Sequence, residues 1–381
     1  MDTRTKYRVL RALHLNGSLT AKALSALCDI PSATCLRAAR QLCAMGLVKE
    51  SVSTLKNNRK QIKFSSVKNE LRALGIHILQ NKVVMSVVSS DGNVCDTLSL
   101  ERDADYSELS NINEIAEHAE RLISENGYLI KAIGITRPGP VMLHNGLIRR
   151  VQSFGGINAE LLADELRLAF EVPVTCSFDS ECAGEYYLLK NREAVNGVTC
   201  VVVAGDTVTA AIFNDGKLLR SNGLAGLIGH TGLNFRDERC YCGNRGCLEN
   251  YVSTSLLIDS LQTSTLFGVN LLTFDEAVEL YKSGDPSTVK SVDNLAANLA
   301  IGLVNMIWTL NPSNIIVTGD LTRFGGVLSG PINSVIKQRV LPEAFAALTI
   351  SVSDNVTDEF AAGSGISAFG EGLETKFKIS K

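Results

Sequence analysis

The segment from His230 to Glu249, HTGLNFRDERCYCGNRGCLE, constrains this chain more than any other stretch. One histidine and three cysteines, Cys240, Cys242 and Cys247, lie close together in it. Three thiolates and an imidazole are the ligand set of a closed, tetrahedral structural Zn²⁺ site. The alternative is three ordinary core cysteines beside an unrelated histidine. Because the cysteines are surrounded by arginine, aspartate, glutamate and asparagine, the sequence predicts one structural zinc ion per chain, bound by His230 and the three thiolates.

The composition is that of a soluble globular protein. The chain has 381 residues, 45% of them hydrophobic and 20% charged, which is enough for two or three domains with large cores. Its ten cysteines are irregularly spaced, and the first residues, MDTRTKYRVL, contain no apolar run. We therefore expect a cytoplasmic protein without a secretory leader. No apolar stretch is long enough for a membrane span.

Charge is distributed unevenly along the chain. The net charge is −3, yet residues 1–70 contain thirteen lysines and arginines against four aspartates and glutamates. The remainder is therefore acidic. A basic head on an acidic body indicates that the head contacts a polyanion.

The head has the outline of a winged helix-turn-helix. The spacing of apolar residues predicts a first helix at 3–15, a second helix that begins after an N-cap at Thr20, and a third helix at 32–45. Two strands follow at 47–52 and 61–67, with a basic tip between them. In such a domain the third helix enters the DNA major groove and the tip of the wing lies on the phosphates or in the minor groove. The alternative interpretation is a small protein-interaction domain with solvated charges.

The polar face of the third helix provides the predicted DNA contacts. That face contains Ser32, Thr34, Arg37, Ala38, Arg40 and Gln41. With the N-cap and the wing, the predicted DNA-binding residues are Thr20, Ser32, Thr34, Arg37, Arg40, Gln41, Lys56, Arg59 and Lys60. The sequence does not decide which arginine contacts a base and which contacts a phosphate.

The body mixes hairpins with crossover helices in two strand-rich halves. This pattern predicts two α/β lobes with a cleft, and we place the domains at 1–70, 71–190 and 191–381. Asp179 follows a strand predicted at 172–178, where such folds bind ligands. It is either a general base for a substrate hydroxyl or the N-cap of a helix beginning at Ser180.

Taken together, these features resemble the ROK family of repressors, open reading frames and kinases, over nearly the whole chain. The 230–249 segment is similar to the family motif G-E-x-G-H…C-x-C-G-x-x-G-C-x-E, and the segment LNPSNIIV at 310–317 is similar to its L-N-P-x-x-I-V strand entry. The resemblance implies an actin-like sugar-kinase body behind the winged helix, as in the sugar-repressor branch. It also implies zinc on the four residues named above.

Elements that kinases of this family use for nucleotides are altered here. The D-x-G-G-T phosphate loop aligns with 75–82, where His77 replaces the aspartate and both glycines are missing. The G-T-G-x-G loop reads Gly205-Asp206-Thr207-Val208-Thr209, and the later G-G pair is Gly319-Asp320. The resemblance therefore implies no ATP binding, no kinase activity and no catalytic residue.

The sugar site implied by the resemblance is partly retained. Its five positions are Phe178, Asp179, Leu227, His230 and Glu249, of which Asp179, His230 and Glu249 keep the family residue. Asp179 marks the vestigial kinase base. Each lost hydrogen bond to a hydroxyl costs about 1–3 kcal/mol, so the site predicts an unusual effector or weakened sensing. Phe178 could stack on a sugar ring or fill the pocket, and we assign Phe178, Asp179, His230 and Glu249 to the effector site.

These observations predict a transcriptional regulator of carbohydrate genes, most simply a repressor. It would bind a double-stranded operator as a homodimer or tetramer, with affinity set by a sugar or sugar-phosphate effector. Two other functions are weighed against it. One is a sugar kinase with a regulatory head, and the other is a regulator controlled by a protein partner.

Overall fold

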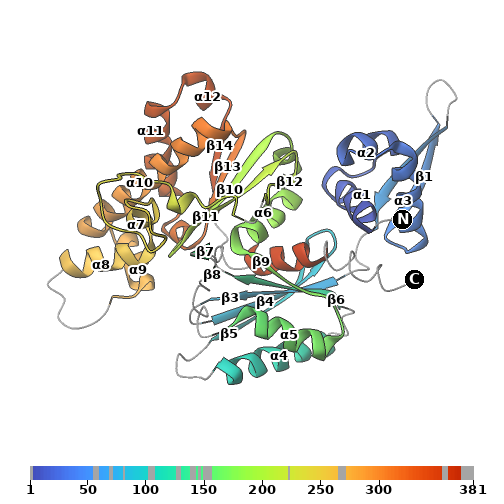
Figure 1. The fold of residues 1–381 in the computed structure, drawn as a ribbon, viewed down its shortest axis with the longest axis horizontal. Helices are drawn as coiled ribbons and strands as arrows, with labels where there is room; N and C mark the ends of the chain where they lie inside the picture. Colours follow the sequence, from blue (N-terminus) through green and yellow to red (C-terminus); the bar gives the residue numbers. More distant parts are fainter. Residues whose placement is uncertain are drawn as a thin grey trace.

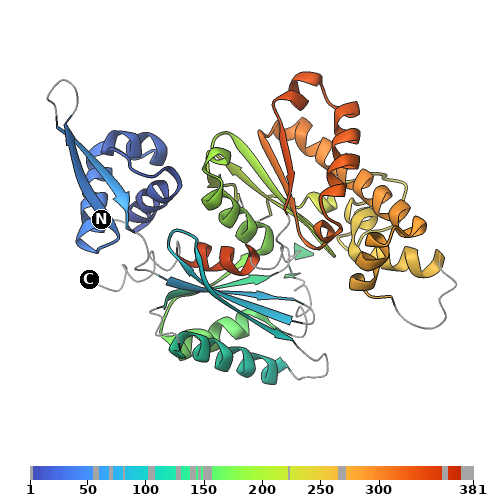
Figure 2. The same ribbon diagram turned by 180° about the vertical axis from the view of Figure 1, so that it is seen from behind.

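The computed structural model describes residues 3–54, 60–67, 72–79, 82–101, 108–125, 130–137, 143–144, 147–148, 157–221, 224–264, 272–353 and 359–369. A small head lies beside a body of two lobes (Figure 1), and the view from behind shows the same arrangement (Figure 2). Within the described ranges no helix is long and apolar enough to cross a membrane.

The head contains the helices and the hairpin that the sequence predicts. Its elements are α1 (Thr3–Asn16), α2 (Ala21–Cys28), α3 (Ser32–Ala44), β1 (Val48–Thr54) and β2 (Lys60–Ser66), with β1 and β2 antiparallel. Thr20 caps α2, because its side chain accepts a hydrogen bond from the N–H of Ala23 at 3.2 Å. One core joins all three helices to the hairpin, as Leu13, Leu24 and Phe64 illustrate. The prediction for Ala38 was wrong: its side chain is fully buried in this core and is not part of the polar face.

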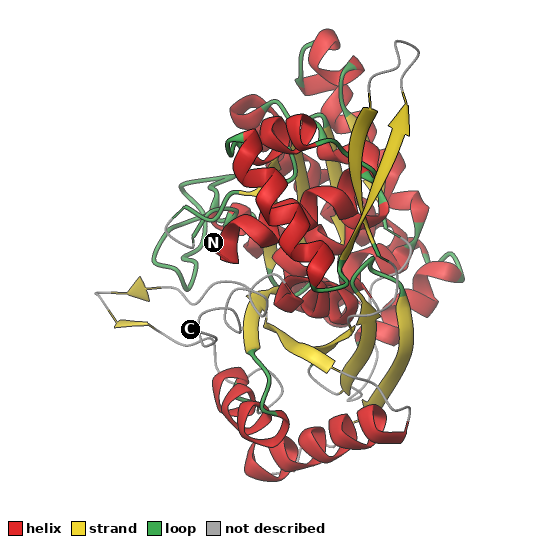
Figure 3. Cartoon of the chain, turned by 90° about the vertical axis from the view of Figure 1, so that its right-hand side faces the viewer, coloured by secondary structure: helices red, strands yellow, loops and turns green. Residues whose placement is uncertain are grey.

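The first lobe is a five-stranded sheet in the order β5-β4-β3-β6-β9. Its strands are β3 (Arg72–Ile78), β4 (Lys82–Ser89), β5 (Val94–Glu101), β6 (Ile130–Arg137) and β9 (Val174–Phe178), and a small hairpin is formed by β7 (Leu143–His144) and β8 (Leu147–Ile148). Helices α4 (Glu108–Glu125) and α5 (Ala159–Phe170) cover one face of the sheet through Ile112, Ile115 and Leu162 (Figure 3).

The second lobe repeats this topology in the order β12-β11-β10-β13-β14. Its strands are β10 (Val198–Ala204), β11 (Val208–Asn214), β12 (Lys217–Leu218), β13 (Asn314–Thr318) and β14 (Thr349–Val352). Its helices are α7 (Glu249–Val252), α8 (Thr254–Ser264), α9 (Phe274–Lys282), α10 (Pro286–Leu310), α11 (Ser329–Arg339) and α12 (Pro342–Ala346), with 3₁₀ turns η1 (Arg192–Val195), η2 (Ile228–His230), η3 (Asp320–Phe324) and η4 (Gly326–Leu328). In both sheets three antiparallel strands are followed by two parallel ones, as expected for two related α/β lobes.

Two helices lie between the sheets. Helix α6 (Asp179–Lys190) packs on the second sheet, and a helix at 359–369, which we call the bridging helix, packs on the first (Figure 1). Gly75 and Gly134 are register partners on β3 and β6, and the backbone of the bridging helix lies directly over them. Phe360 on the same helix packs against the second sheet.

The bridging helix departs from the predicted division of the body. We expected residues 191–381 to belong to the second lobe, yet Ala362, Ala368 and Phe369 pack with Ala73 of the first sheet. The chain therefore leaves the first lobe near α6 and returns to it at 359–369. This return depends on contacts between residues nearly 300 positions apart, which local sequence patterns do not reveal.

Two helices of the second lobe begin at residues suited to a helix start. Helix α10 begins at Pro286, with Asp285 as its N-cap. Gly330-Pro331 lies in the first turn of α11, where a proline loses no helical hydrogen bond. Strand β14 and the short helix α7 were not predicted.

Candidate functional site

The four predicted metal ligands lie together in the second lobe. One ligand atom from each of His230, Cys240, Cys242 and Cys247 lies within 4.8 Å of the others. The Sγ atoms of Cys242 and Cys247 are 3.7 Å apart, as are Cys240 Sγ and His230 Nδ1. A tetrahedral ion with metal–sulfur bonds of about 2.3 Å requires ligand atoms roughly 3.8 Å apart. The donor set and its spacing therefore fit a closed zinc site.

The loop around this cluster is held by backbone contacts. Gly243 and Gly246 have positive φ angles of 95° and 58°, and a Cβ on Gly246 would lie 1.8 Å from the carbonyl oxygen of Asn234. The N–H of Cys240 donates to Asn244 O at 2.8 Å. Only glycine permits this close approach at a positive φ, which explains why the chain can bring three cysteines to one point.

The thiolate forms of these cysteines are unfavourable unless a cation lies beside them. Burial, followed by the neighbouring thiols Cys242 and Cys240, raises the pKa of Cys247 to about 12. Burial also raises the pKa of Cys240. All three cysteines are free thiols. A divalent cation would supply the charge that these buried sulfurs lack.

His230 contacts the cluster through one ring nitrogen and Tyr241 through the other. Its Nε2 lies 3.3 Å from the hydroxyl of Tyr241, and the two rings meet edge to face at 5.2 Å. Burial and the nearby carboxylate of Glu249 raise the pKa of Tyr241. Tyr241 therefore contacts the His230 ring beside the cluster, a contact that the sequence prediction did not include.

Glu249, predicted as an effector ligand, is anchored in the second lobe. It is the first residue of α7 and is only 5% exposed. Its Oε2 accepts the backbone N–H of Val208 at 2.8 Å, at the first residue of β11. This contact ties α7 to the turn between β10 and β11.

Asp179 lies at the junction of the two lobes. It is the first residue of α6, and the N-cap is Phe178, which provides no side-chain cap. The Asp179 Oδ1 accepts the N–H of Ser180 at 2.7 Å and the hydroxyl of Thr209 on β11 at 3.3 Å. Its carboxylate therefore stabilises the first turn of α6 from within the helix and fastens that turn to the second sheet.

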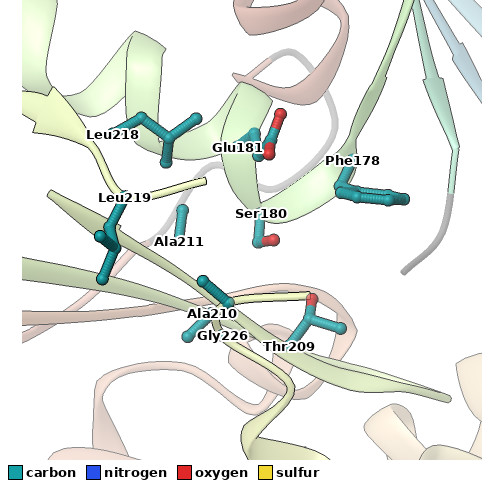
Figure 4. Close-up of a pocket in the computed structure, with 10 residues that line it drawn as sticks. Phe178, Ser180, Glu181, Thr209, Ala210, Ala211, Leu218, Leu219 and Gly226 are labelled. Atoms are coloured by element: carbon teal, nitrogen blue, oxygen red, sulfur yellow. The ribbon is translucent and has the colours of Figure 1, made fainter. Parts of the chain in front are cut away.

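A small pocket lies beside this junction (Figure 4). The side chains and backbone that line it are Phe178, Ser180, Glu181, Thr209, Ala210, Ala211, Leu218, Leu219, Ala225 and Gly226. Of the four predicted effector residues, only Phe178 lines this pocket, although Asp179 is its neighbour. His230 and Glu249 lie at the metal cluster. Sequence reasoning missed Ser180, Glu181 and Thr209, whose only signal was their position next to Asp179 or after Gly205.

The positions aligned with phosphate loops have other roles here. His77 is 7% exposed, packs edge to face on Phe360 at 4.8 Å, and has a pKa lowered to about 3, chiefly by burial. Asp206 accepts the N–H of Ser255 at 3.4 Å at the start of α8. Burial raises the pKa of Asp320, opposed by Arg323 and reinforced by Asp206. The first loop position is thus an uncharged imidazole, and the second carries a carboxylate close to another.

The predicted DNA-binding residues of α3 form one outer surface of the head. Ser32, Arg37 and Arg40 are exposed, whereas Thr34 and Gln41 are half-buried. Arg40 Nε lies 3.7 Å from Glu50 Oε2 on β1. Lys60 is exposed at the start of β2, whereas Lys56 and Arg59 lie outside the described residues. Arg37 therefore presents the clearest exposed cation on the helix.

Comparison with known proteins agrees with this architecture. A winged helix-turn-helix DNA-binding model matches residues 2–49, and the ROK family model matches residues 73–368. The xylose repressor of Caldicellulosiruptor bescii is 27% identical over 237 residues, which is 59% of this chain and 59% of that repressor. The chain thus spans less than two thirds of that relative's length. The glucokinase of Thermotoga maritima is 23% identical over 76% of this chain and 94% of the enzyme.

A solved structure supports the fold over the full length. The crystal structure of a ROK family transcriptional regulator described as a homolog of the E. coli MLC protein covers 98% of each chain, with a TM-score of 0.74 and 19% identity. The predicted winged helix followed by an actin-like, two-lobed ROK body is confirmed. The residues matched by the family model make up most of the chain, so this protein belongs to the ROK family.

Proposed function

We propose that this chain is a DNA-binding transcriptional repressor whose operator affinity is set by a sugar-like ligand bound to its body. The observation that carries the proposal is the exposed face of α3, with Ser32, Arg37 and Arg40, on a basic winged helix joined to a ROK body. The name of the xylose repressor relative points the same way. The protein would act as a homodimer or tetramer, because two recognition helices are needed to read a near-palindromic operator.

Selection of duplexes from a random-sequence pool tests this function directly. We expect enrichment of a near-palindromic site, and loss of that enrichment for Arg37→Ala. Lys290→Ala is a matched control, since it also removes one cation but on α10, away from the head. Absence of any enrichment with the wild-type chain would refute DNA recognition. Footprinting of bound sites in the cell would then identify the regulated genes.

We propose the effector site at the junction of α6 and β11, with Phe178 and Asp179 next to the ligand; the other two predicted residues, His230 and Glu249, lie at the metal cluster beside this junction. The nearby pocket is lined by both apolar and polar groups, as ligand sites usually are. We expect a sugar or sugar phosphate to raise the thermal midpoint of the wild type and to raise it less for Asp179→Asn. D-xylose, D-glucose and their phosphates are the first probes. If none of these shifts the midpoint, a pull-down decides whether a protein partner acts instead.

We further propose that His230, Cys240, Cys242 and Cys247 bind one structural Zn²⁺ per chain. When bound, the ion would neutralise the buried thiolates and fix the loop that carries Tyr241 beside Glu249. Elemental analysis should find one zinc per wild-type chain and none in Cys247→Ser, with Cys95→Ser as the control for an exposed thiol elsewhere. Chelation should weaken operator binding, and a metal-free protein with undiminished affinity would contradict that role.

Kinase activity is not part of the proposed function. The T. maritima relative is named a glucokinase, so the alternative calls for a direct measurement. The carboxylates of Asp206 and Asp320 lie near the loop where a kinase of this family would hold triphosphate, and would repel it. A coupled assay with ATP and the same sugars should show no turnover above the Asp179→Asn background. Sugar-dependent turnover abolished by that substitution would establish the kinase function instead.

A further inference from the structure

The DNA-binding head is docked on the body through a specific contact of α1. Arg11 Nη2 lies 2.6 Å from Glu185 Oε2 on α6, and the two side chains are only 18% and 12% exposed. Arg11 Nη1 also donates to the carbonyl oxygen of Gly216, in the turn between β11 and β12. A charge-assisted pair this sheltered from water holds its geometry better than an exposed surface pair.

An apolar contact reinforces this ion pair. Leu15 of α1 is 6% exposed and belongs to the body's cluster with Leu188, Val195 and Phe213, not to the head's own core. Val9, Leu10 and Leu13 of α1 pack inside the head with α3. One face of α1 therefore supports the recognition helix, and another is fixed to the body.

The same body elements also line the pocket. Helix α6 contributes Ser180 and Glu181 to the pocket and Glu185 to the head contact. Asp179 and Glu185 are six residues apart, which is about 9 Å along a helix. The β11–β12 hairpin contributes Leu218 and Leu219 to the pocket and the Gly216 carbonyl to Arg11. Figure 4 shows α6 and the hairpin on two sides of the pocket.

Helix α6 has little freedom to deform between Ser180 and Glu185. A Cβ on Gly184 would lie 2.3 Å from the Phe213 ring, so α6 sits directly on β11. On another side, the Cys182 carbonyl lies so close to the bridging helix that a Cβ on Gly363 would be 2.0 Å from it. Helices packed this tightly move as units and do not bend locally, so a displacement at the pocket end must also appear at Glu185.

We propose that α6 and the β11–β12 hairpin transmit the state of the pocket to the DNA-binding head through Arg11 and Leu15. A ligand that displaces Ser180, Glu181 or Leu219 moves the acceptors of Arg11, and α1 carries α3 with it. The effect of this coupling on operator affinity rests on the proposed function. The mechanical coupling between the head and the pocket does not depend on that function. Coupling between two sites is reciprocal, so it can also be measured from the head towards the pocket.

Amide hydrogen exchange of the full chain, without any ligand, tests the coupling itself. Two pocket amides are suitable reporters: Ala210 N–H donates to Gly226 O and Leu219 N–H donates to Ile212 O, both at 2.8 Å. We expect Arg11→Ala to accelerate exchange at these reporters at least about threefold. Arg323→Ala is the matched control, because it breaks a 2.5 Å pair with Asp275 that does not involve the head. Unchanged reporters in Arg11→Ala would overturn the proposal.

Two further measurements separate coupling from simple damage and from failure of the proposed function. The charge-exchanged chain, Arg11→Glu with Glu185→Arg, should return the reporters towards wild-type exchange. With the selected operator duplex bound, the reporters should change in the wild type but not in Arg11→Ala. A change of equal size in both, or in neither although DNA binds, would refute transmission through Arg11. If the wild type binds no DNA, the proposed function fails, while exchange in the free protein still decides the coupling.

Discussion

The close packing of the bridging helix on the first sheet leads to a specific prediction about stability. A Cβ on Gly134 would lie 2.0 Å from the carbonyl oxygen of Ser364 and 2.3 Å from its carbon. An ordinary contact needs more than 3 Å, so the helix would have to retreat by over 1 Å. It cannot do so freely, because Gly363 on its opposite side is in equally close contact with Cys182 O. Gly134→Ala should therefore force two packed layers apart.

The magnitude follows from two contributions. Overpacking of this kind costs about 1–3 kcal/mol, and more where neighbours cannot move. The hydrogen bond from Ser364 Oγ to Gly134 O, 3.2 Å long, would also be strained, at about 0.5–1.5 kcal/mol. We expect a loss of roughly 2–4 kcal/mol, a large fraction of the ~5–15 kcal/mol that stabilises a typical protein.

Urea unfolding followed by circular dichroism measures this loss against a matched glycine. Gly326, in the 3₁₀ turn η4, has no neighbouring atom within 4 Å of the point where a Cβ would lie and is followed by a valine, so Gly326→Ala adds the same methyl group in open space. That control should leave the stability unchanged or raise it by about 0.4–1 kcal/mol, because alanine reduces the entropy of the unfolded chain. If Gly134→Ala and Gly326→Ala unfold at the same urea concentration, the bridging helix does not pack on the first sheet as described.

Three other predictions concern the site, the acidic pair and the DNA surface. Glu249→Ala should destabilise the protein by about 1–3 kcal/mol in urea unfolding, because it leaves the buried Val208 N–H without an acceptor. Glu249→Gln keeps an acceptor and should destabilise the protein clearly less. Equal losses of stability in the two variants would contradict the anchoring role. Asp320→Asn should stabilise the protein at neutral pH. The pKa of Asp320 is raised in the folded state, so the stability of the wild type falls as pH rises from the unfolded-state pKa through the folded-state pKa. The gain should vanish in acid, where Asp320 is protonated in both states, and a gain that is independent of pH would refute this origin. If Arg37 contacts a phosphate, Arg37→Ala should reduce the slope of log K for DNA binding against log salt concentration by about 0.9. If Arg37 contacts a base, the same substitution should relax the sequence preference at one base pair. If neither the slope nor the sequence preference changes, Arg37 is not part of the DNA interface.

Local sequence patterns predicted much of the fold, since the helices and the hairpin of the head follow their apolar spacing and caps. The metal cluster could be anticipated for the same reason, because its ligands lie within one short loop. Leu15 shows the limit of this reasoning. It lies at the end of the helix that apolar spacing predicts at 3–15, but it packs with Phe213 of the body, nearly 200 positions away. Ala38 shows the converse error, because a small residue carries too little signal to be assigned to a buried face.

The remaining site residues were missed because their roles depend on distant partners. Glu249 was assigned to an effector by its motif, and its contact with Val208 could not be foreseen from a helix start alone. Arg11 and Glu185 form an ion pair across 174 positions, without any pattern that links them. The position of the bridging helix also depends on distant partners. Gly75 and Gly134 leave room for this helix, but their common role becomes visible only when β3 and β6 are paired.

The proposed function requires a kinase-like body that responds to a ligand other than a nucleotide, and the duplicated topology supports this proposal. The two lobes place equivalent turns after their first strands, β3 and β10. The strand leading to the first turn carries His77, uncharged and packed on Phe360, and the second turn carries Asp206 beside Asp320. The second turn, with two carboxylates close together, lacks the positive surroundings that attract phosphate. Under the proposed function, a neutral ligand would act on the two lobes at the junction of α6 with β11, where the hydroxyl of Thr209 donates to Asp179.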